Sequence, residues 1–170
     1  LKIALLSHHV SLKAALKKVR RESLLDFFIS LHRSVKGARA GGFEFLVAGL
    51  NPHAGEDGLL GREEIEEIAP AVKEARRHGL KISGPYPPDV VFRSALGRKD
   101  KMVIALYHDQ GLIPFKLAAF ETGVNVSLGL PFVRTSPDHG TAFDIAGKNR
   151  ADPRSLVEAI KLAAVFSRPA

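Results

Sequence analysis

Histidines follow three apolar stretches of the sequence that have the composition of β-strands. Residues 103–106 lead into His108, residues 3–6 lead into a pair of histidines, and residues 45–48 lead into His53. In an open α/β sheet, ligands collect beyond the carboxyl ends of the strands. Three imidazoles gathered there suit a divalent transition metal with an open coordination position. Each histidine taken singly can equally satisfy a backbone carbonyl, so it is the matching placement of all three that indicates a shared site.

The other histidines have different contexts. His8 and His9 are neighbours, and in an extended chain their side chains point in opposite directions, so we expect only one of them to serve the site. The residues alone do not decide which one. His32 and His78 stand among charged residues at the ends of predicted helices, and we expect both on the surface.

Five further polar residues could complete such a site. Asp109 and Asp89 can orient a histidine or contact a polar substrate; alternatively, Asp109 caps a turn and Asp89 caps a short helix. Lys116 is the only charge in its apolar stretch. A lone cation of this kind usually extends its head group to solvent. Together with Asn125 and Arg134, it can instead form a clamp for a phosphate or carboxylate group.

Predicted strands and helices alternate along the chain, which indicates a layered α/β fold. Apolar runs and alternation predict strands at residues 3–6, 43–48, 80–83, 102–106 and 124–128. Helical spacing predicts helices at residues 12–32, 62–78 and 92–96. In the second of these, Pro70 should produce a kink or a break, and Gly79 is the expected C-terminal cap.

The C-terminal part of the sequence is less regular. Residues 112–120 are apolar without a clear period, and residues 129–134 are predicted to form a loop. A last helix is predicted to begin with Asp152 as N-cap and Pro153 as first helical residue. Its spacing predicts a buried stripe made of Leu156, Val157, Ile160, Ala163 and Ala164.

The composition limits the classes of function. The 170 residues, 45% hydrophobic and 25% charged, are typical of one globular domain. There is no cysteine, which excludes disulfides and cysteine-based zinc sites. The lack of a long apolar run and of a signal peptide predicts a cytoplasmic protein without a membrane partner. The chain starts with Leu1 rather than Met, so we expect it to be a fragment of a longer protein.

The net charge of +7 raises the question of a nucleic-acid partner. The basic residues are, however, interspersed with glutamates, and the most basic run, residues 17–21, has no aromatic residue for base stacking. We therefore expect solvated helix faces and no nucleic acid. A positive field also favours a phosphorylated small-molecule substrate.

Three motifs stand out in this sequence: Asn-Pro-His-Ala-Gly at 51–55, Tyr-His-Asp-Gln-Gly at 107–111, and residues 125–136. Together they resemble the 4-hydroxythreonine-4-phosphate dehydrogenase family, the NAD-dependent enzymes of the deoxyxylulose-phosphate-dependent route to pyridoxal phosphate. The resemblance covers nearly the whole chain but only the C-terminal half of the family's usual length. It implies a layered α/β/α fold of the isocitrate/isopropylmalate dehydrogenase-like type with a mixed sheet. Residues 1–170 would then be the C-terminal half of a two-domain dehydrogenase, without its N-terminal half.

The resemblance implies that the metal ligands are His9, His53 and His108. The first motif departs from the family, because residues 7–12 read Ser-His-His-Val-Ser-Leu where the family has Thr-Thr-His-Leu-Pro-Leu. His9 aligns with the family's histidine, and His8 is an additional neighbour. The metal itself would be zinc, cobalt, magnesium or manganese.

Other site residues follow from the same resemblance. Lys116, Asn125 and Arg134 match substrate-binding positions, and Asp89 matches an aspartate close to the substrate. Asp89 and Lys116 are thus the expected catalytic residues. The family's remaining substrate contacts, a His-Thr pair, lie upstream of Leu1.

A second resemblance concerns residues 139–148, which are similar to the adenosine-binding loop of the isocitrate and isopropylmalate dehydrogenases. It implies that NAD, or NADP, is bound by a segment made of His139, Gly140, Thr141 and Ala142. These enzymes bind the dinucleotide without a Gly-x-Gly-x-x-Gly motif, and this sequence has none.

The implied reaction is NAD-dependent oxidation of 4-phosphooxy-L-threonine (4-hydroxythreonine 4-phosphate). The resulting 3-oxo acid would lose CO₂ to give 3-amino-2-oxopropyl phosphate, in pyridoxine 5′-phosphate biosynthesis. The resemblance also implies a homodimer with the active site at the subunit interface. Two alternatives remain: a sister dehydrogenase acting on 4-phospho-erythronate or 4-phospho-threonate, and a non-catalytic, metal-binding dimeric fragment.

Overall fold

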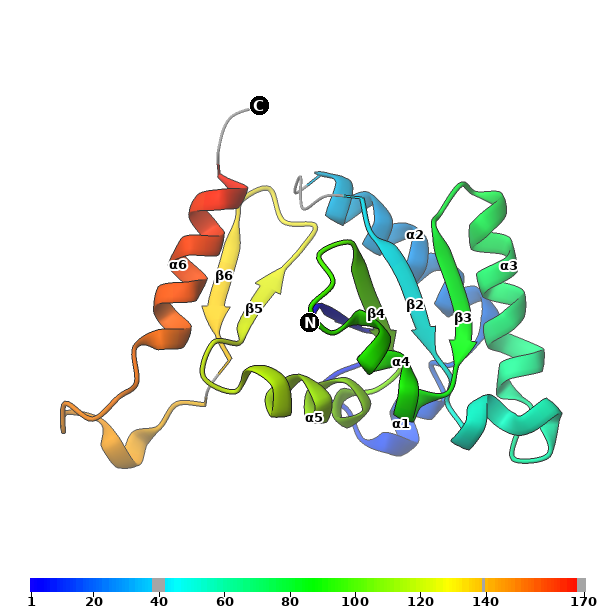
Figure 1. The fold of residues 1–170 in the computed structure, drawn as a ribbon, viewed down its shortest axis with the longest axis horizontal. Helices are drawn as coiled ribbons and strands as arrows, with labels where there is room; N and C mark the ends of the chain where they lie inside the picture. Colours follow the sequence, from blue (N-terminus) through cyan, green and yellow to red (C-terminus); the bar gives the residue numbers. More distant parts are fainter. Residues whose placement is uncertain (38–41, 139, 168–170) are drawn as a thin grey trace.

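A computed structural model of the chain describes residues 1–37, 42–138 and 140–167 (Figure 1). Its centre is a parallel sheet with the strand order β1-β4-β2-β3. The strands are β1 (Ile3–Leu5), β2 (Glu44–Ala48), β3 (Ile82–Tyr86) and β4 (Lys101–Ala105). Because the strands are parallel, their carboxyl ends lie along one edge, and the segments that follow β1, β2 and β4 meet there.

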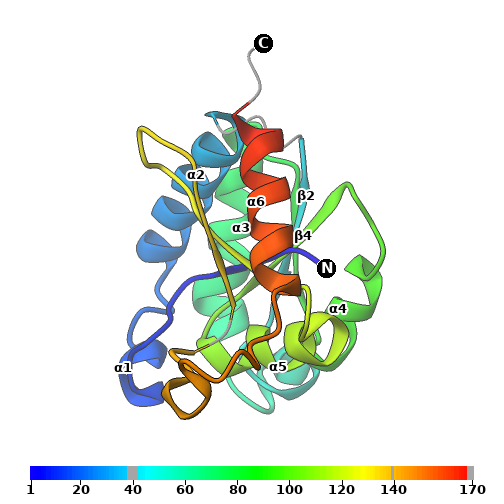
Figure 2. The ribbon, with the colours of Figure 1, turned by 90° about the vertical axis from the view of Figure 1, so that its left-hand side faces the viewer.

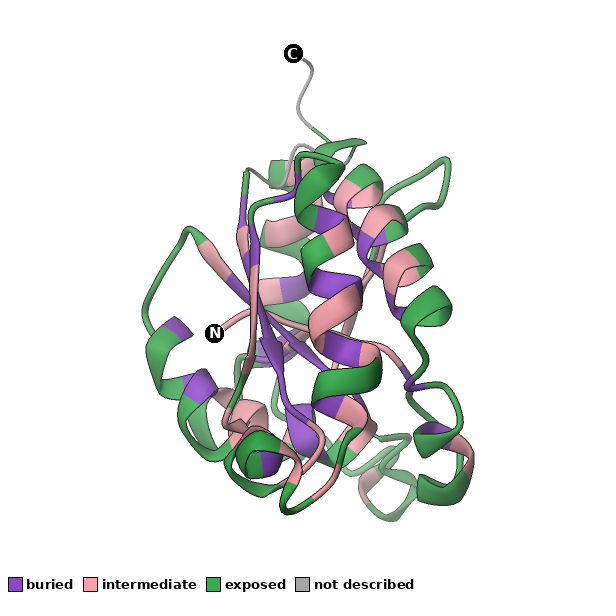
Figure 3. Ribbon diagram, turned by 90° about the vertical axis from the view of Figure 1, so that its right-hand side faces the viewer, coloured by how far each residue is buried: buried purple, intermediate pink, exposed green. Residues whose placement is uncertain are grey.

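Helices cover both faces of this sheet. On one face, α2 (Arg21–Gly37) and α3 (Ala69–Arg77) pack against the buried side chains of Phe45, Val47 and Ile104. On the other face, α4 (Pro88–Ala95) packs against Leu46 and Val103, and α5 (His108–Ala119) lies against β1 and β4. Figure 3 shows the buried residues concentrated on the strands and on the helix faces turned toward them.

The glycine at the start of α5 permits an unusually close approach between this helix and the sheet. A Cβ atom on Gly111 would lie 2.7 Å from Leu5 Cδ2 and 3.0 Å from both Ala105 Cβ and Ile3 Cγ2. Any side chain here would push the first turn of α5 away from β1 and β4. Gly111 therefore holds His108, the first residue of this helix, close to the strand ends.

The predicted helix at residues 12–32 is wrong as a single element. The chain forms α1 (Leu12–Leu16) and then, after a turn, α2. Val19 lies in that turn and is only 2% exposed, so the helix is interrupted where an apolar side chain enters the core. Helical spacing alone cannot report such a break, because the apolar residues on both sides of the turn keep the expected period.

Instead of the kink or break predicted at Pro70, the structure shows a change of helix type just before it, with helical backbone throughout. A π-helical turn, η2 (Glu64–Ile68), precedes α3, and Pro70 occupies the first turn of α3, where its missing N–H costs least. Gly79 adopts a φ of 82°, which confirms it as the residue that ends the helix.

The C-terminal part forms a separate antiparallel ribbon. Strand β5 (Val124–Ser127) is confirmed, and it pairs with β6 (Arg134–Pro137), a strand that sequence patterns did not predict. Helix α6 (Arg154–Phe166) packs on this ribbon, and Figure 2 shows it on the outer side of the molecule. Short 3-10 helices, η1 (Pro52–Gly58) and η3 (Phe143–Ile145), complete the fold.

The predicted start and buried stripe of α6 are wrong. Pro153 is the N-cap, and the side chain of Asp152 accepts a hydrogen bond from the Arg154 backbone N–H at 3.0 Å. Of the helix residues, only Ser155 and Ala159 are buried, whereas the predicted core residue Ile160 is 61% exposed. The ribbon covers a narrow strip of the helix, and no second layer of the described chain covers the rest.

The expected fold class is confirmed. Helices on both faces of a parallel sheet give the α/β/α layers, and the antiparallel pairing of a mixed architecture occurs in the separate β5–β6 ribbon. None of the described helices is both long and apolar enough to cross a membrane.

Candidate functional site

The strand ends form a pocket of about 300 Å³ that contains two of the predicted metal ligands. His9 follows β1 and His108 begins α5 after β4, so the parallel register of these strands brings the two side chains together. The centroids of their rings are 5.7 Å apart. His8 and Asp109 also line this pocket.

Hydrogen bonding determines how the rings in the pocket can act. The His108 Nδ1 atom lies 2.6 Å from the Asp109 carboxylate. When a carboxylate accepts from Nδ1–H, the Nε2 atom keeps its lone pair and can bind a metal. Asp109 thus has the orienting role that the sequence allowed. His8 and His9 approach each other with their Nδ1 atoms 3.4 Å apart, so one donates and the other accepts.

His53 is not part of this pocket. It lies in η1, and its side chain is absent from the residues that line the pocket. Within the described residues, no group of three or more His, Cys, Asp or Glu side chains is placed to hold a metal ion. The chain therefore brings together His9 and His108, but not the third predicted ligand.

The backbone conformation at His9 and at His53 is unusual. His9 has a φ of 47° and His53 a φ of 52°, in the left-handed region that residues with a Cβ atom rarely adopt. His53 begins a run in which all residues from 53 to 57 have positive φ. Backbone of this kind persists only when the surrounding contacts hold it, and it is concentrated at functional sites.

A buried glutamate supports the loop before His53. Glu64 is 3% exposed and accepts hydrogen bonds from the backbone N–H groups of Leu50 (2.7 Å) and Asn51 (2.8 Å). The Asn51 side chain donates to it as well, at 2.9 Å. A Cβ atom on Gly55, whose φ is 84°, would lie 2.8 Å from the Glu64 carboxylate, so glycine is required there.

Sequence reasoning missed the role of Glu64. It stands in an acidic run with Glu63, Glu66 and Glu67, at the start of the helix predicted at residues 62–78. Glu63 also receives a hydrogen bond from Asn51, and this bond is the main reason why the pKa of Glu63 is lowered. Nothing in the local sequence distinguishes the buried member of the run from its neighbours.

The three residues of the predicted anion clamp lie on three different elements, α5, β5 and β6. Lys116 on α5 donates to the Asp138 backbone carbonyl at 3.2 Å, and its Nζ atom lies 3.4 Å from the Asp138 carboxylate. Arg134 on β6 donates to the Ser127 hydroxyl at 2.8 Å and lines a second pocket of about 480 Å³. Asn125 is exposed on β5, opposite Ser136 in the ladder. No hydrogen bond joins the three predicted clamp residues to one another in the described structure.

Asp89 and the described part of the predicted adenosine-binding segment are exposed on the surface. Asp89 is exposed in the first turn of α4, where the helix dipole favours a carboxylate. Of the predicted adenosine-binding residues, Gly140, Thr141 and Ala142 are exposed before η3, and Ala142 has a φ of 49°. His139 lies outside the described residues.

Two solved structures that share this arrangement are described as dehydrogenases. The 4-hydroxythreonine-4-phosphate dehydrogenase of Klebsiella pneumoniae superimposes with a TM-score of 0.85 at 42% identity, over 98% of this chain and 50% of that chain. A terephthalate 1,2-cis-dihydrodioldehydrogenase of Burkholderia xenovorans gives a TM-score of 0.73 at 30% identity, over 99% of this chain and 53% of that one. The fold is thus that of one half of a dehydrogenase class with several substrates.

The family can be stated more narrowly. The family model described as pyridoxal phosphate biosynthetic protein PdxA matches residues 1–163, and the chain belongs to this family. The 4-hydroxythreonine-4-phosphate dehydrogenase of Aquifex aeolicus is 50% identical over 166 residues, 95% of this chain and 50% of the relative. A relative in Halalkalibacterium halodurans, provisionally named a D-threonate 4-phosphate dehydrogenase, is 45% identical over 167 residues, 98% of this chain and 50% of the relative. The chain spans about half the length of these relatives.

Proposed function

We propose that this chain is the metal- and substrate-binding half of an NAD-dependent dehydrogenase that oxidises 4-phosphooxy-L-threonine. The observation that carries the proposal is the meeting of His9 and His108 at the carboxyl ends of β1 and β4. Membership of the family supplies the substrate and the place in pyridoxine 5′-phosphate biosynthesis. Residues 1–170 would act as the C-terminal half of a two-domain protein.

The two histidines fit a divalent metal. Zinc–nitrogen distances of about 2.1 Å and a tetrahedral arrangement place two ligating rings roughly 5 Å apart, close to the observed separation of 5.7 Å. The Asp109 contact leaves the Nε2 atom of His108 available. Imidazole donors favour zinc or cobalt, and oxygen atoms of a bound substrate would also admit magnesium or manganese. When bound, such a cation supplies Lewis-acid polarisation of a substrate oxygen.

We propose that His53 of a second copy completes the metal site. The pocket also contains His8, but within the described residues no three His, Cys, Asp or Glu side chains are placed to hold a metal, and His53 of the same chain does not line the pocket. The left-handed backbone at His53 is the kind found at functional sites, which supports a ligand role for this residue. A symmetric homodimer would give two equal sites, each with residues from both subunits.

The cations of the site would bind the anionic substrate. Lys116 and Arg134 carry the positive charge, and both are held by groups that a phosphate or carboxylate can replace: the Asp138 carboxylate and the Ser127 hydroxyl. Asn125 would donate a further hydrogen bond, and Asp89 would lie close to the substrate. Lys116 is also suited to transfer a proton to or from the substrate, so Lys116 and Asp89 are the proposed catalytic residues.

The dinucleotide would bind at residues 139–142. When bound, NAD supplies the hydride acceptor. Gly140, Thr141 and Ala142 are exposed residues, which leaves room for an adenosine group against this segment. The positive φ of Ala142 turns the backbone just before η3.

Metal titration tests the histidine set. We expect the wild-type protein to bind Zn²⁺ stoichiometrically, and His53→Ala and His108→Ala each to lose this binding. His78→Ala is the matched control, because His78 is exposed at the end of α3 and remote from the pocket. Retention of stoichiometric Zn²⁺ by either site variant would refute the three-histidine site.

Mixing the two variants tests the interface. In a heterodimer of His53→Ala and His108→Ala, one shared site keeps all its histidines and the other loses two. Random mixing should therefore restore Zn²⁺ to about a quarter of the sites. A site built within one chain would give no restoration at all. Light scattering on the same samples measures whether the dimer forms.

A second substrate class is favoured by one comparison, the relative provisionally named for D-threonate 4-phosphate. Its phosphate and hydroxyl groups would use the same cations and metal. Formation of NADH, followed with 4-phosphooxy-L-threonine, 4-phospho-D-erythronate and D-threonate 4-phosphate in parallel, decides between them. We expect the highest kcat/KM for 4-phosphooxy-L-threonine, and turnover of only a sugar-acid phosphate would reverse the assignment. Stoichiometric metal binding without turnover of any of them would favour a non-catalytic fragment.

A further inference from the structure

A chain of buried hydrogen bonds connects the three segments that carry the predicted metal ligands. Its centre is Gln110, which is 9% exposed. The Gln110 side-chain N–H donates to the Gly49 carbonyl at 2.7 Å, and its side-chain oxygen accepts from the Leu106 N–H at 2.7 Å. The Ser7 hydroxyl donates to the Leu106 carbonyl at 2.9 Å. Both backbone groups of Leu106 are thus bound by side chains.

Each end of this chain lies just before a histidine. Ser7 precedes His9 by two residues, Leu106 precedes His108 by two, and Gly49 precedes His53 by four. Beyond the ends of β1, β2 and β4, these side-chain hydrogen bonds take the place of hydrogen bonds between strand backbones. The three loops are therefore held to one another at the point where they leave the sheet.

Few polar side chains are buried in the described chain, and most of them bind the histidine-bearing segments. Only four polar residues of the described chain are buried: Ser7, Glu64, Gln110 and Ser155. Three of the four bind backbone in the histidine-bearing segments, and Gln110 is the one that binds two such segments at once. Burying an amide is unfavourable unless its donors and acceptor are used, and an apolar side chain would fill the same space without this cost.

We propose that Gln110 is a positioning residue of the metal site, an inference that rests on the proposed metal function. Its amide sets the distance and angle between the loop of His53 and the first turn of α5, which begins with His108. In a dimer, each chain would give His9 and His108 to one metal site and His53 to the other. The Gln110 link would then fix how these two groups of ligands are oriented relative to each other within one chain. Gln110 itself does not touch the metal, because both ends of its amide are bound to backbone.

Two variants of Gln110 separate bridging from simple packing. Gln110→Met keeps the size and removes both hydrogen bonds. Gln110→Glu keeps an acceptor for the Leu106 N–H, and in its ionised form it has no hydrogen to donate to the Gly49 carbonyl. If the bridge positions the ligands, both variants should bind Zn²⁺ about 10- to 100-fold more weakly than wild type, as measured by competition with a chromophoric chelator. If Gln110 acts only through its hydrogen bond with the Leu106 N–H, Gln110→Glu should bind Zn²⁺ like wild type.

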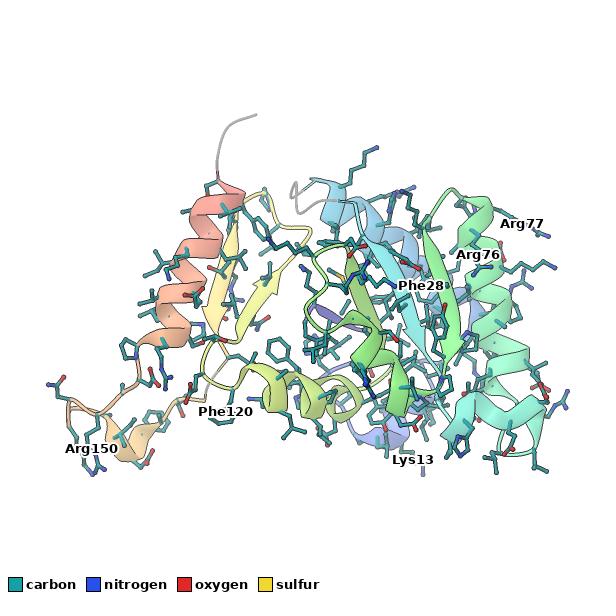
Figure 4. The ribbon with its side chains drawn as sticks, viewed as in Figure 1. Lys13, Phe28, Arg76, Arg77, Phe120 and Arg150 are labelled. Carbon is teal, nitrogen blue, oxygen red and sulfur yellow. The ribbon has the colours of Figure 1, made fainter. Side chains whose placement is uncertain are left out.

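Coordination geometry gives a readout that packing alone does not move. The visible spectrum of bound Co²⁺ reports its ligand arrangement, and we expect both Gln110 variants to change its band positions or intensity. The matched control is Arg76→Met, which removes one 2.7 Å hydrogen bond to the Ile82 carbonyl on the far edge of the sheet, where Figure 4 shows Arg76 on α3. Arg76→Met should retain wild-type affinity and spectrum even if its melting temperature falls.

The outcomes distinguish this inference from the proposed function. Failure of the wild-type protein to bind Zn²⁺ or Co²⁺ would refute the metal site itself. Wild-type binding together with unchanged affinity and spectrum in Gln110→Glu would refute the positioning role and leave the metal site standing. Should Gln110→Met fail to fold, Gln110→Glu still decides the question, since it retains the hydrogen bond with the Leu106 N–H.

Discussion

The two parts of this chain differ in what covers their apolar side chains. In the sheet body (β1 to β4 with α2, α3 and α4), helices on both faces bury the core. In the ribbon wing (β5, β6 and α6), one helix lies on one narrow ribbon. Within the described residues, every buried hydrophobic residue precedes residue 107 except Ala159. Figure 4 shows the contrast between Phe28, inside the body, and Phe120, at the end of α5 toward the wing.

The comparison teaches that an amphipathic pattern does not by itself bury a helix face. The spacing of apolar residues in α3 and in α6 is equally helical, yet Val72 is 3% exposed and Ile160 is 61% exposed. Burial of a helix face requires other elements packed against it. Of these two helices, only α3 has its apolar face covered in the described chain. Phe120 and Leu117, at 75% and 86%, are exposed for the same reason. The candidate site lies where the covered part of the chain gives way to the uncovered part.

The largest expected effect is a cavity in the sheet body. Phe28 is fully buried, so Phe28→Ala should lower the free energy of unfolding by about 3–5 kcal/mol. Urea denaturation followed by circular dichroism measures this loss. A loss below about 1 kcal/mol would mean that the body is not the stable part of the chain.

A smaller loss is expected from the buried carboxylate below the His53 loop. Glu64→Ala leaves the N–H groups of Leu50 and Asn51 without their acceptor, and we expect a cost of about 3 kcal/mol. Glu64→Gln keeps an acceptor oxygen and should cost less. If Glu64→Ala unfolds at the wild-type urea concentration, the loop does not depend on this residue.

The junction between α1 and α2 should depend on pH. The hydrogen bond from the Arg21 backbone N–H, followed by that from the Arg20 guanidinium, lowers the pKa of Glu67 from its ordinary value of 4.5. Because the folded pKa is the lower one, this stabilisation is complete above pH 4.5 and is lost as the pH falls through the lowered pKa. At neutral pH, Glu67→Ala removes the acceptor at the start of α2 and should cost about 1 kcal/mol.

Denaturation at two pH values checks this prediction. The difference between wild type and Glu67→Ala should shrink in acid, where the wild-type carboxylate is protonated. Glu66→Ala is the control, since the Glu66 side chain is 56% exposed and forms only a surface pair with Arg62. A difference that stays constant with pH would show that charge on Glu67 is unimportant.

The smallest effect is expected in the wing. Ile160 is mostly exposed on α6, so Ile160→Ser should change the free energy of unfolding of this chain by less than about 0.5 kcal/mol. The contrast with Phe28→Ala, measured under the same conditions, expresses the difference between body and wing directly. A loss comparable to that of Phe28→Ala would show that a second layer covers α6 in solution.

Much of the sheet body could be predicted from the sequence, and the reasons for success and failure are physical. Apolar runs marked β1, β2 and β4 and the positions of His9 and His108 after two of them, whereas the strand predicted at residues 80–83 overlaps only the start of β3 (Ile82–Tyr86). Strand β6 was missed because Arg134-Thr135-Ser136-Pro137 lacks apolar alternation and forms a strand only through pairing with β5. The uncovered face of α6 was missed because periodicity reports amphipathicity and not the presence of a partner layer.

The site was predictable in part. Strand ends indicated where histidines would gather, but no pattern indicated that His53 would stay outside the pocket of His9 and His108. The supporting residues were beyond reach for a different reason. Gln110 and Gly49 are 61 residues apart, and a polar side chain does not announce a distant backbone partner. Such partners become visible only once the fold brings them together.

The left-handed run from residue 53 to residue 57 has a consequence for the thermodynamics of metal binding. An unfolded chain of L-residues rarely visits the left-handed region, so restricting residues 53–57 to it costs conformational entropy. This cost is met when the chain folds, before any metal binds. A metal ion that binds His53 would meet a loop already restricted to its bound shape. Binding should then carry little conformational entropy cost, and the affinity would depend mainly on ligand exchange and on desolvation of the imidazoles.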